Sequence, residues 1–300
     1  MSAADLSVLR RPNDRLRRRR LVSRGMELLA WLAAAVAVAI LGIVVWSVAK
    51  RGASELSLDL LTKPVVPFAA PDVTQGLANA FAGTLVMVGL ATLMALPVGI
   101  LIAIYVNEFA PRVIRRGLGL TLDILNGVPA IVIGIFVFGL LVVSHGQSGF
   151  AGGVALAVLM LPLVARSTIE VLLLVPGSLR EAALGVGAPR WRTTLGIVLP
   201  QAVGGIVTGA VLAVARVAGE TAPLLFVSSV GVSPGADWNP AHALQSVPVA
   251  IFELSDTGVP SDTARAWAAA FVLLMFILVT SLTARWLANR SRRKLQRASG

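Results

Sequence analysis

Long uncharged stretches alternate with short polar segments along the whole chain. An α-helix needs about 20 mostly apolar residues to cross the hydrocarbon core of a bilayer. Stretches suited to this, each with at most two charged residues, lie at 28–49, 73–107, 118–144, 150–165, 193–230 and 266–284. The fourth is short and is expected to run a little into the polar segment after it. The pattern therefore predicts an all-α integral membrane protein with six spans.

The composition supports a membrane protein. The chain of 300 residues is 56% hydrophobic and 14% charged, and its mean hydropathy is +0.83. Soluble globular domains carry about 25% charged residues. This supply of charge is too small to cover a water-facing surface, which excludes an ordinary soluble enzyme. The absence of cysteine excludes a disulfide scaffold and a thiolate metal site.

The net charge of +11 comes from basic residues that cluster between the apolar stretches. Cytoplasmic loops of membrane proteins carry an excess of Lys and Arg. If the N-terminus is cytoplasmic, 21 of the 26 basic residues fall in cytoplasmic segments, and six spans return the C-terminus to the same side. We therefore expect both termini to be cytoplasmic, and the basic residues to mark topology rather than a nucleic-acid partner.

The same pattern divides the chain into four segments. These are a basic cytoplasmic leader (1–26), the first span with its outer loop (27–75), a transmembrane domain (76–285) and a basic cytoplasmic tail (286–300). A cleaved signal peptide is the alternative for the first span, because residues 33–35 mimic a cleavage site. The apolar run exceeds the roughly 7–15 residues of the hydrophobic core of a signal peptide, which favours a retained anchor.

The loop between the fourth and fifth spans predicts a short helix. Ser178 and Glu181 have the spacing of an N-terminal capping box, and Gly185 and Gly187 would end the helix. The face formed by Ala182 and Ala183 is small and almost featureless. On these residues alone, the helix is either an amphipathic connector or a docking surface for another protein.

A spaced motif runs through this loop. Glu181-Ala182-Ala183 is followed after three residues by Gly187, and after nine more by Ile197-Val198-Leu199-Pro200. This motif resembles the permease signature of bacterial ABC importers. The resemblance implies a six-span MetI-like permease whose cytoplasmic coupling helix docks on an ATPase subunit through Glu181, Ala182, Ala183 and Gly187.

The fifth span contains two charged residues, Arg216 and Glu220. A charge in a span costs about 3 kcal/mol on insertion scales, so such residues are seldom idle. Four residues apart on a helix, the two side chains would share one face and reach each other. They form either an ion pair that fixes helix packing or a polar patch on a translocation path, where a guanidinium meets an oxyanion. Pro223, one turn on, predicts a bend.

A second resemblance narrows the choice of substrate class. The segment 219–225 (GETAPLL) is similar to a sequence of PstA-type phosphate permeases, as are 107–110, 125–129 and 199–209, although Phe109 stands where Tyr is common. This resemblance covers about 76–285 and omits the arginine-rich leader. It implies a substrate path at Arg216, Glu220 and Thr221 in a protein of the bacterial cell membrane.

The resemblance also implies partners. These are a homologous PstC-type permease, two copies of an ATPase subunit and an extracytoplasmic phosphate-binding protein, with ATP and Mg bound by partner subunits and no cofactor in this chain. The alternatives are the same fold with another substrate (sulfate, molybdate or an amino acid), a membrane scaffold and an intramembrane enzyme. The outer segment 239–255 is either a surface helix for the binding protein or an ordered loop without a partner.

Other motifs in the chain are weaker. Gly205 and Gly209 form a G-x-x-x-G that allows close helix approach, either within the chain or against a second permease subunit. The two histidines, His145 and His242, lack the spacing of metal ligands. G-x-S-x-G at 231–235 and S-x-x-K at 47–50 lack the context of catalytic motifs, and no Walker A sequence is present. We therefore expect neither a catalytic residue nor a metal site.

Overall fold

The computed structural model describes residues 14–64, 75–229 and 235–298. Part of the predicted leader (1–13) and most of the G-x-S-x-G match at 231–235 lie outside these residues. The chain forms two units, residues 1–50 and residues 51–300. The first contains most of α1 (Asp14–Gly52). The second contains every other helix, and within the described ranges it includes no strand.

The helices of the second unit follow one another through short connections. In chain order they are α2 (Leu58–Thr62), α3 (Ala78–Ile104), α4 (Arg112–Gly127), α5 (Ala130–Val137), α6 (Val143–His145), α7 (Gly149–Leu173), α8 (Gly177–Gly185), α9 (Arg190–Thr193), α10 (Leu199–Val217), α11 (Leu224–Val227), α12 (Val247–Asp256) and α13 (Pro260–Ala298). A 3-10 turn, η2 (Ala53–Glu55), precedes α2, and three π-helical turns, η3 (Tyr105–Phe109), η4 (Phe138–Val142) and η5 (Thr194–Val198), lie between α-helices.

Five helical stretches in the described ranges are long and apolar enough to cross a membrane: Arg18–Glu55, Ala78–Phe109, Gly149–Leu173, Arg190–Val217 and Pro260–Thr283. They correspond to five of the six predicted spans. The fourth predicted span, at 150–165, is longer than expected, since α7 continues to Leu173 and so includes Arg166. The all-α membrane fold is confirmed.

The third predicted span is not one straight helix. Residues 118–144 fall on α4 and on the helix from Ala130 to His145, and these two meet at an angle of 94°. The cause is Pro129: a residue that precedes proline is pushed out of the helical conformation, and Val128 is extended, with φ −68° and ψ 127°. If the bent pair is one span, the described residues hold six, as predicted.

The core of the bundle forms where α3 and α7 pack together. A Cβ at Gly152 would lie 2.4 Å from Sδ of Met87, and one at Gly153 would lie 2.8 Å from Cβ of Leu90. Glycine at these two positions lets α7 approach α3 closely. Ala91, Ala155 and Met160 are fully buried between the two helices.

The G-x-x-x-G of α10 packs within the chain, against α7. A Cβ at Gly205 would lie 2.5 Å from Cγ1 of Val171, and one at Gly209 would lie 2.6 Å from Oγ of Ser167. Of the two readings that the sequence left open, the structure therefore supports packing inside this subunit.

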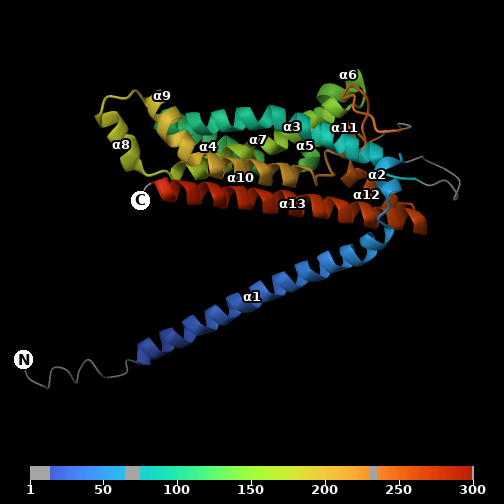
Figure 1. The fold of residues 1–300 in the computed structure, drawn as a ribbon, viewed down its shortest axis with the longest axis horizontal. Coiled ribbons are helices and arrows are strands. Elements are labelled where there is room, and N and C mark those ends of the chain that lie inside the picture. Colours follow the sequence, from blue (N-terminus) through green and yellow to red (C-terminus); the bar gives the residue numbers. More distant parts are fainter. Residues whose placement is uncertain (1–13, 65–74, 230–234, 299–300) are drawn as a thin grey trace, which may run out of the picture. The chain divides into compact units, whose positions relative to one another are not determined.

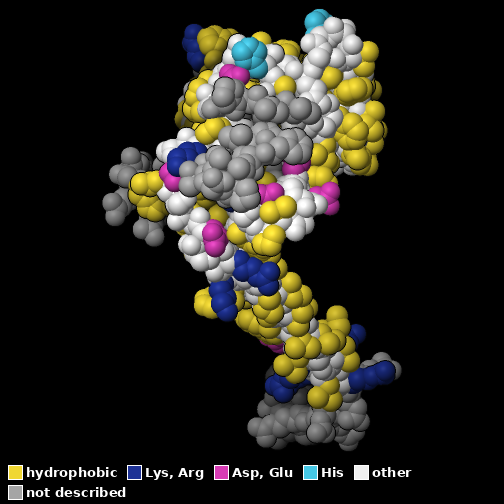
Figure 2. Space-filling model, turned by 90° about the vertical axis from the view of Figure 1, so that its right-hand side faces the viewer, with side chains coloured by type: hydrophobic (Ala, Val, Ile, Leu, Met, Phe, Trp, Pro, Cys, Tyr) yellow, Lys and Arg dark blue, Asp and Glu magenta, His cyan; other side chains and the backbone are white. Residues whose placement is uncertain are grey.

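The two ends of the bundle differ in charge. Figure 1 shows α8 and α9 at one end, and α6, α11 and α2 toward the other. The end with α8 and α9 carries exposed arginines: Arg112, Arg116, Arg190 and Arg192. Figure 2 views the opposite end, where acidic side chains gather; the exposed ones of α12 are Glu253 and Asp256.

Candidate functional site

The helix α8 begins two residues earlier than a capping box at Ser178 would require. Pro176, with φ −55° and ψ 133°, is its N-cap, and no side chain caps the first turn. Ser178 therefore lies inside the helix, and the predicted box between Ser178 and Glu181 was wrong. The reason is that proline already has the φ of an entering residue and lacks an N–H that needs a partner, so the chain turns into the helix at Gly177.

The end of α8 matches the expectation. Gly187 has a φ of +84°, in the left-handed region that glycine adopts without strain. Its N–H donates to the carbonyl of Leu184 (3.0 Å), and the N–H of Ala188 donates to the carbonyl of Ala183 (3.1 Å). These two hydrogen bonds form a Schellman motif, which ends the helix sharply and satisfies its last carbonyls.

The two alanines of the motif point to different surroundings. Ala183 is only 6% exposed, whereas Ala182 and Glu181 are exposed. Leu184 and Val186 also expose apolar surface, 45% and 85% respectively. The open side of α8 is thus small, partly apolar and edged by one carboxylate, and Ala183 packs toward the bundle.

An ion pair holds α8 on the bundle. Arg180 Nη2 lies 2.9 Å from Oε1 of Glu108, and Arg180 Nε lies 3.2 and 3.3 Å from the two carboxylate oxygens. Arg180 also donates from Nη1 to the carbonyl of Val175 (2.7 Å) and from Nη2 to that of Leu172 (2.9 Å). A second donor to Glu108 is Nδ2 of Asn107, at 2.7 Å.

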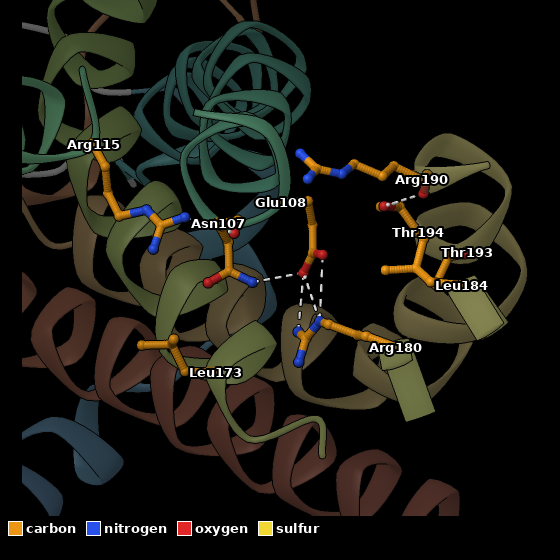
Figure 3. Close-up of a pocket in the computed structure, with 9 residues that line it drawn as sticks. All are labelled: Asn107, Glu108, Arg115, Leu173, Arg180, Leu184, Arg190, Thr193 and Thr194. Atoms are coloured by element: carbon orange, nitrogen blue, oxygen red, sulfur yellow. Dashed lines mark hydrogen bonds and ion pairs between the residues drawn. The ribbon is translucent and has the colours of Figure 1, made fainter. Parts of the chain in front are cut away.

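These side chains border a pocket of about 410 Å³ between α8, η3 and η5. Figure 3 shows the guanidinium of Arg180 and the carboxylate of Glu108 in direct contact at the wall of this pocket. The lining residues are Asn107, Glu108, Arg115, Leu173, Arg180, Leu184, Arg190, Thr193 and Thr194. Sequence reasoning gave Arg180 and Glu108 no role, because they are 72 positions apart and no local spacing links them.

The polar residues of the fifth span lie at its end, and not on one helical face. α10 ends at Val217, so Arg216 is in its last turn and Glu220 has left the helix. In the described part of the chain, no hydrogen bond or ion pair joins the two side chains. The predicted pairing was therefore wrong, because Pro223 cannot continue the helix and Gly219 ends it readily.

The predicted bend at Pro223 is confirmed, since α11 resumes only at Leu224. The break rests on α5, because a Cβ at Gly134 would lie 2.6 Å from Cα of Pro223. Arg216 is exposed, and Glu220 and Thr221 are half-buried. The structure thus places the three predicted path residues within one short segment, more than 20 residues along the chain from the Glu181–Gly187 motif.

A further charged pair links α7 to α4 and was missed by the sequence analysis. Arg166 of α7 forms an ion pair with Asp123 of α4 and donates from Nη2 to the carbonyl of Gly119 (2.7 Å), while its Nε is buried without a partner. The sequence placed Arg166 in the loop because the apolar run ends at Ala165. Only the length of α7 shows that it belongs to a helix.

The histidines make local hydrogen bonds. His242 Nδ1 lies 2.8 Å from Oδ2 of Asp237, and the N–H of Asn239 donates to Oδ1 of the same carboxylate at 2.9 Å. The pKa of Asp237 is lowered, first by the hydrogen bond from Asn239 and then by His242. Among the residues that the structure describes, no group of three or more His, Cys, Asp or Glu side chains could hold a metal ion.

Comparisons with known proteins agree with this architecture. The model of the family described as "binding-protein-dependent transport system inner membrane component" matches residues 95–293. The phosphate transport system permease protein PstA 1 of Mycobacterium tuberculosis is 40% identical over 73% of this chain and 72% of its own length. The phosphate transport system permease protein PstA of Xylella fastidiosa is 37% identical over 92% of this chain and 96% of its own length.

Solved structures share the fold at lower identity. A bacterial alginate ABC transporter, solved in complex with a periplasmic protein, is 17% identical, covers 90% of this chain and 96% of its own, and has a TM-score of 0.62. The MetNI methionine ABC transporter is 19% identical, covers 71% and 93%, and has a TM-score of 0.55. The family match spans well over half of the chain, so this chain belongs to the family of binding-protein-dependent transport system inner membrane components.

Proposed function

We propose that this chain is the transmembrane permease subunit of an ATP-driven phosphate importer. The observation that carries the proposal is the identity of 37–40% to PstA proteins over 73–92% of the chain. The chain is then a transport subunit and not an enzyme, and ATP hydrolysis belongs to a partner ATPase that holds ATP and Mg. The other half of the translocation path comes from a homologous PstC-type permease.

The helix α8 is the docking element for the ATPase in this proposal. Its open side carries Glu181 and Ala182, and small residues there allow a groove of the partner to approach the backbone closely. The Schellman motif at Gly187 keeps the helix short, so that it moves as a single rigid segment. ATP binding to two ATPase copies would displace α8 and switch the cavity between inward- and outward-facing states.

The orientation follows from charge. The end of the bundle that carries α8 and α9 also carries exposed arginines, which favours the cytoplasmic side. The N- and C-termini are then cytoplasmic as well, and the acidic end faces the extracytoplasmic phosphate-binding protein. Glu253 and Phe252 lie on the exposed face of α12 at that end.

Arg216, Glu220 and Thr221 are the substrate-path residues in the proposal. Arg216 is exposed at the end of α10 and forms no side-chain hydrogen bond or ion pair within the described ranges, so its guanidinium is free to meet a phosphate oxygen pair in a bidentate manner. The half-buried Thr221 hydroxyl adds a donor nearby, and Glu220 would limit how long the anion stays.

Reconstitution tests the proposal. The permease pair and the ATPase are placed in liposomes with the binding protein outside, and ATP-dependent uptake of labelled phosphate is measured. We expect uptake that excess sulfate and molybdate do not compete away. An Arg216→Ala variant is expected to assemble normally and lose uptake, whereas Arg265→Gln, a change at a different arginine of the same chain, retains it. Uptake at the wild-type rate by Arg216→Ala would refute the path assignment.

A further inference from the structure

The ion pair between Arg180 and Glu108 joins α8 to the end of α3 across the pocket of Figure 3. We propose that these two residues are positioning residues that transmit the displacement of α8 to α3. The inference rests on the proposed function, because it takes α8 as the element that the ATPase moves. It adds a route for that movement which the chain connection does not supply.

The contact is strong enough to act as a rigid connection. Arginine presents its N–H groups in a planar fork that matches a carboxylate, and here Nε and Nη2 both reach Glu108. Only 23% of the Arg180 side chain and 10% of the Glu108 side chain are exposed. Water therefore screens the pair weakly, and separating the charges would leave a carboxylate buried without its partner.

Arg180 also fixes where α8 sits relative to α7. Its remaining donors reach the carbonyl of Leu172, in the last turn of α7, and that of Val175, two residues after the helix ends. Through one guanidinium, α8 is thus joined to the end of α7, to the segment between the two helices and to η3. A displacement of α8 must either carry the other two along or break these hydrogen bonds.

The receiving end of the contact is a π-helical turn. η3 is closed by the N–H of Ala110 donating to the carbonyl of Tyr105 at 2.8 Å, and Arg115 of α4 holds the carbonyls of Val106 (3.0 Å) and Asn107 (3.4 Å). π-helical turns inside longer helices are frequent at functional sites. Glu108 therefore lies where α3 meets α4, and a movement of its carboxylate reaches both helices.

Besides its direct chain connection to the end of α7, α8 has two further routes into the bundle. Along the chain, α9 and η5 lead to α10, which ends near Arg216. Across the pocket, the ion pair leads to η3 and α3, and α3 packs closely on α7 through Gly152 and Gly153. Without the ion pair, α8 would act on α3 only indirectly, through the packing of α7 on α3. The pair makes α3 and α10 respond together.

The test separates coupling from assembly. The double variant E108Q/R180M removes both charges of the pair and keeps both volumes, so neither residue is left charged without its partner. The matched control is D262N/R265M, at the ion pair of α13, whose side chains are 18% and 19% exposed. For each complex, three quantities are measured: the ATPase that copurifies, ATP hydrolysis with binding protein present, and phosphate imported per ATP hydrolysed.

We expect E108Q/R180M to retain the ATPase and to hydrolyse ATP, while phosphate imported per ATP falls at least about fivefold, the lower end of measured couplings between sites. The control keeps the wild-type ratio. A wild-type ratio in E108Q/R180M overturns the inference. If that variant does not assemble, E108Q alone decides, because its amide still accepts from Arg180: a smaller fall supports the inference and an unchanged ratio overturns it.

The single variants add a second criterion. If both residues act through one contact, R180M alone should lower the ratio about as far as the double variant does, whereas independent roles would multiply the two single effects. Failure of the proposed function looks different. A wild-type complex that imports no phosphate, or that binds no ATPase, refutes the function itself, whereas normal wild-type import with an unaffected variant refutes only this inference.

Discussion

The packing of α10 on α7 can be tested at one atom. Gly205→Ala places a methyl group 2.5 Å from Cγ1 and 2.8 Å from Cγ2 of Val171, where ordinary contacts begin at 3.4 Å. Val171 is β-branched and held in one rotamer in a helix, so it cannot swing aside. The two helices must separate by about 1 Å, and α10 would carry Arg216 with it.

The size of the effect follows from two opposing contributions. Overpacking costs about 1–3 kcal/mol, and alanine gains up to about 1 kcal/mol over glycine inside a helix. The net loss in the free energy of unfolding is then about 1–2 kcal/mol, which corresponds to a drop in Tm of about 2–8 °C for a unit of this size. The assay is heat-induced aggregation of the assembled importer in detergent, with phosphate uptake measured in parallel.

A second substitution makes this prediction specific. Val171→Ala removes both Cγ atoms and leaves Cβ 3.3 Å from the new methyl group. G205A/V171A should therefore recover most of the lost stability, more than the two single changes would give if they simply added. Gly196→Ala is the control, since nothing lies within 4 Å of its added Cβ. Wild-type stability in G205A, or no recovery in the double variant, would show that α10 does not pack on α7 in this way.

Three further predictions concern the two ends of the bundle. Gly187→Ala forces an L-residue to a φ of +84°, at a cost of about 1–2 kcal/mol. Less ATPase should therefore copurify with this variant, and Gly187→Asn should lose less of it. If both variants retain as much ATPase as the wild type, the backbone is not strained as argued. A cysteine at the exposed Ala182 should cross-link to a cysteine in the ATPase groove, whereas one at Ala183, only 6% exposed, should not; the reverse pattern would mean that α8 docks by its other side. The pKa of Asp237 is lowered, so its hydrogen bonds stabilise the 237–242 turn at pH values above the ordinary pKa of 3.8. This stability is lost as the pH falls through the lowered pKa. Pepsin cleavage of the turn should therefore rise on acidification in the wild type and show no such step in Asp237→Asn.

Much of this protein follows from local sequence. The spans are read from hydropathy because the length of helix needed to cross a bilayer depends only on consecutive residues. The end of α8 is predictable for the same reason: Gly187 adopts a backbone conformation that other residues resist, and the next two hydrogen bonds follow from it. The motif from Glu181 to Pro200 identifies the family because its spacing is also local.

Predictions failed where a neighbouring residue changed the helix. Val128 leaves the helix because of Pro129, so the third span bends by 94°. Pro223 likewise ends α10 early, which separates Glu220 from Arg216. Pro223 predicted the bend but not that α10 would end before Glu220, and the hydropathy of 118–144 did not reveal the break at Pro129. The reason is that hydropathy does not record whether a backbone N–H is available.

What the sequence determined by itself is the set of elements: which residues enter helices that suit a membrane, where α8 stops, and which family the chain belongs to. Only the tertiary structure decided which faces meet. In the structure, Gly205 and Gly209 of α10 pack against Val171 and Ser167. Arg166 lies in a helix beside Asp123, and Glu108 contacts Arg180, 72 positions away along the chain. The physical reason is that helix length and helix ends depend on neighbours along the chain, whereas an ion pair or a close packing contact depends on how whole helices are arranged.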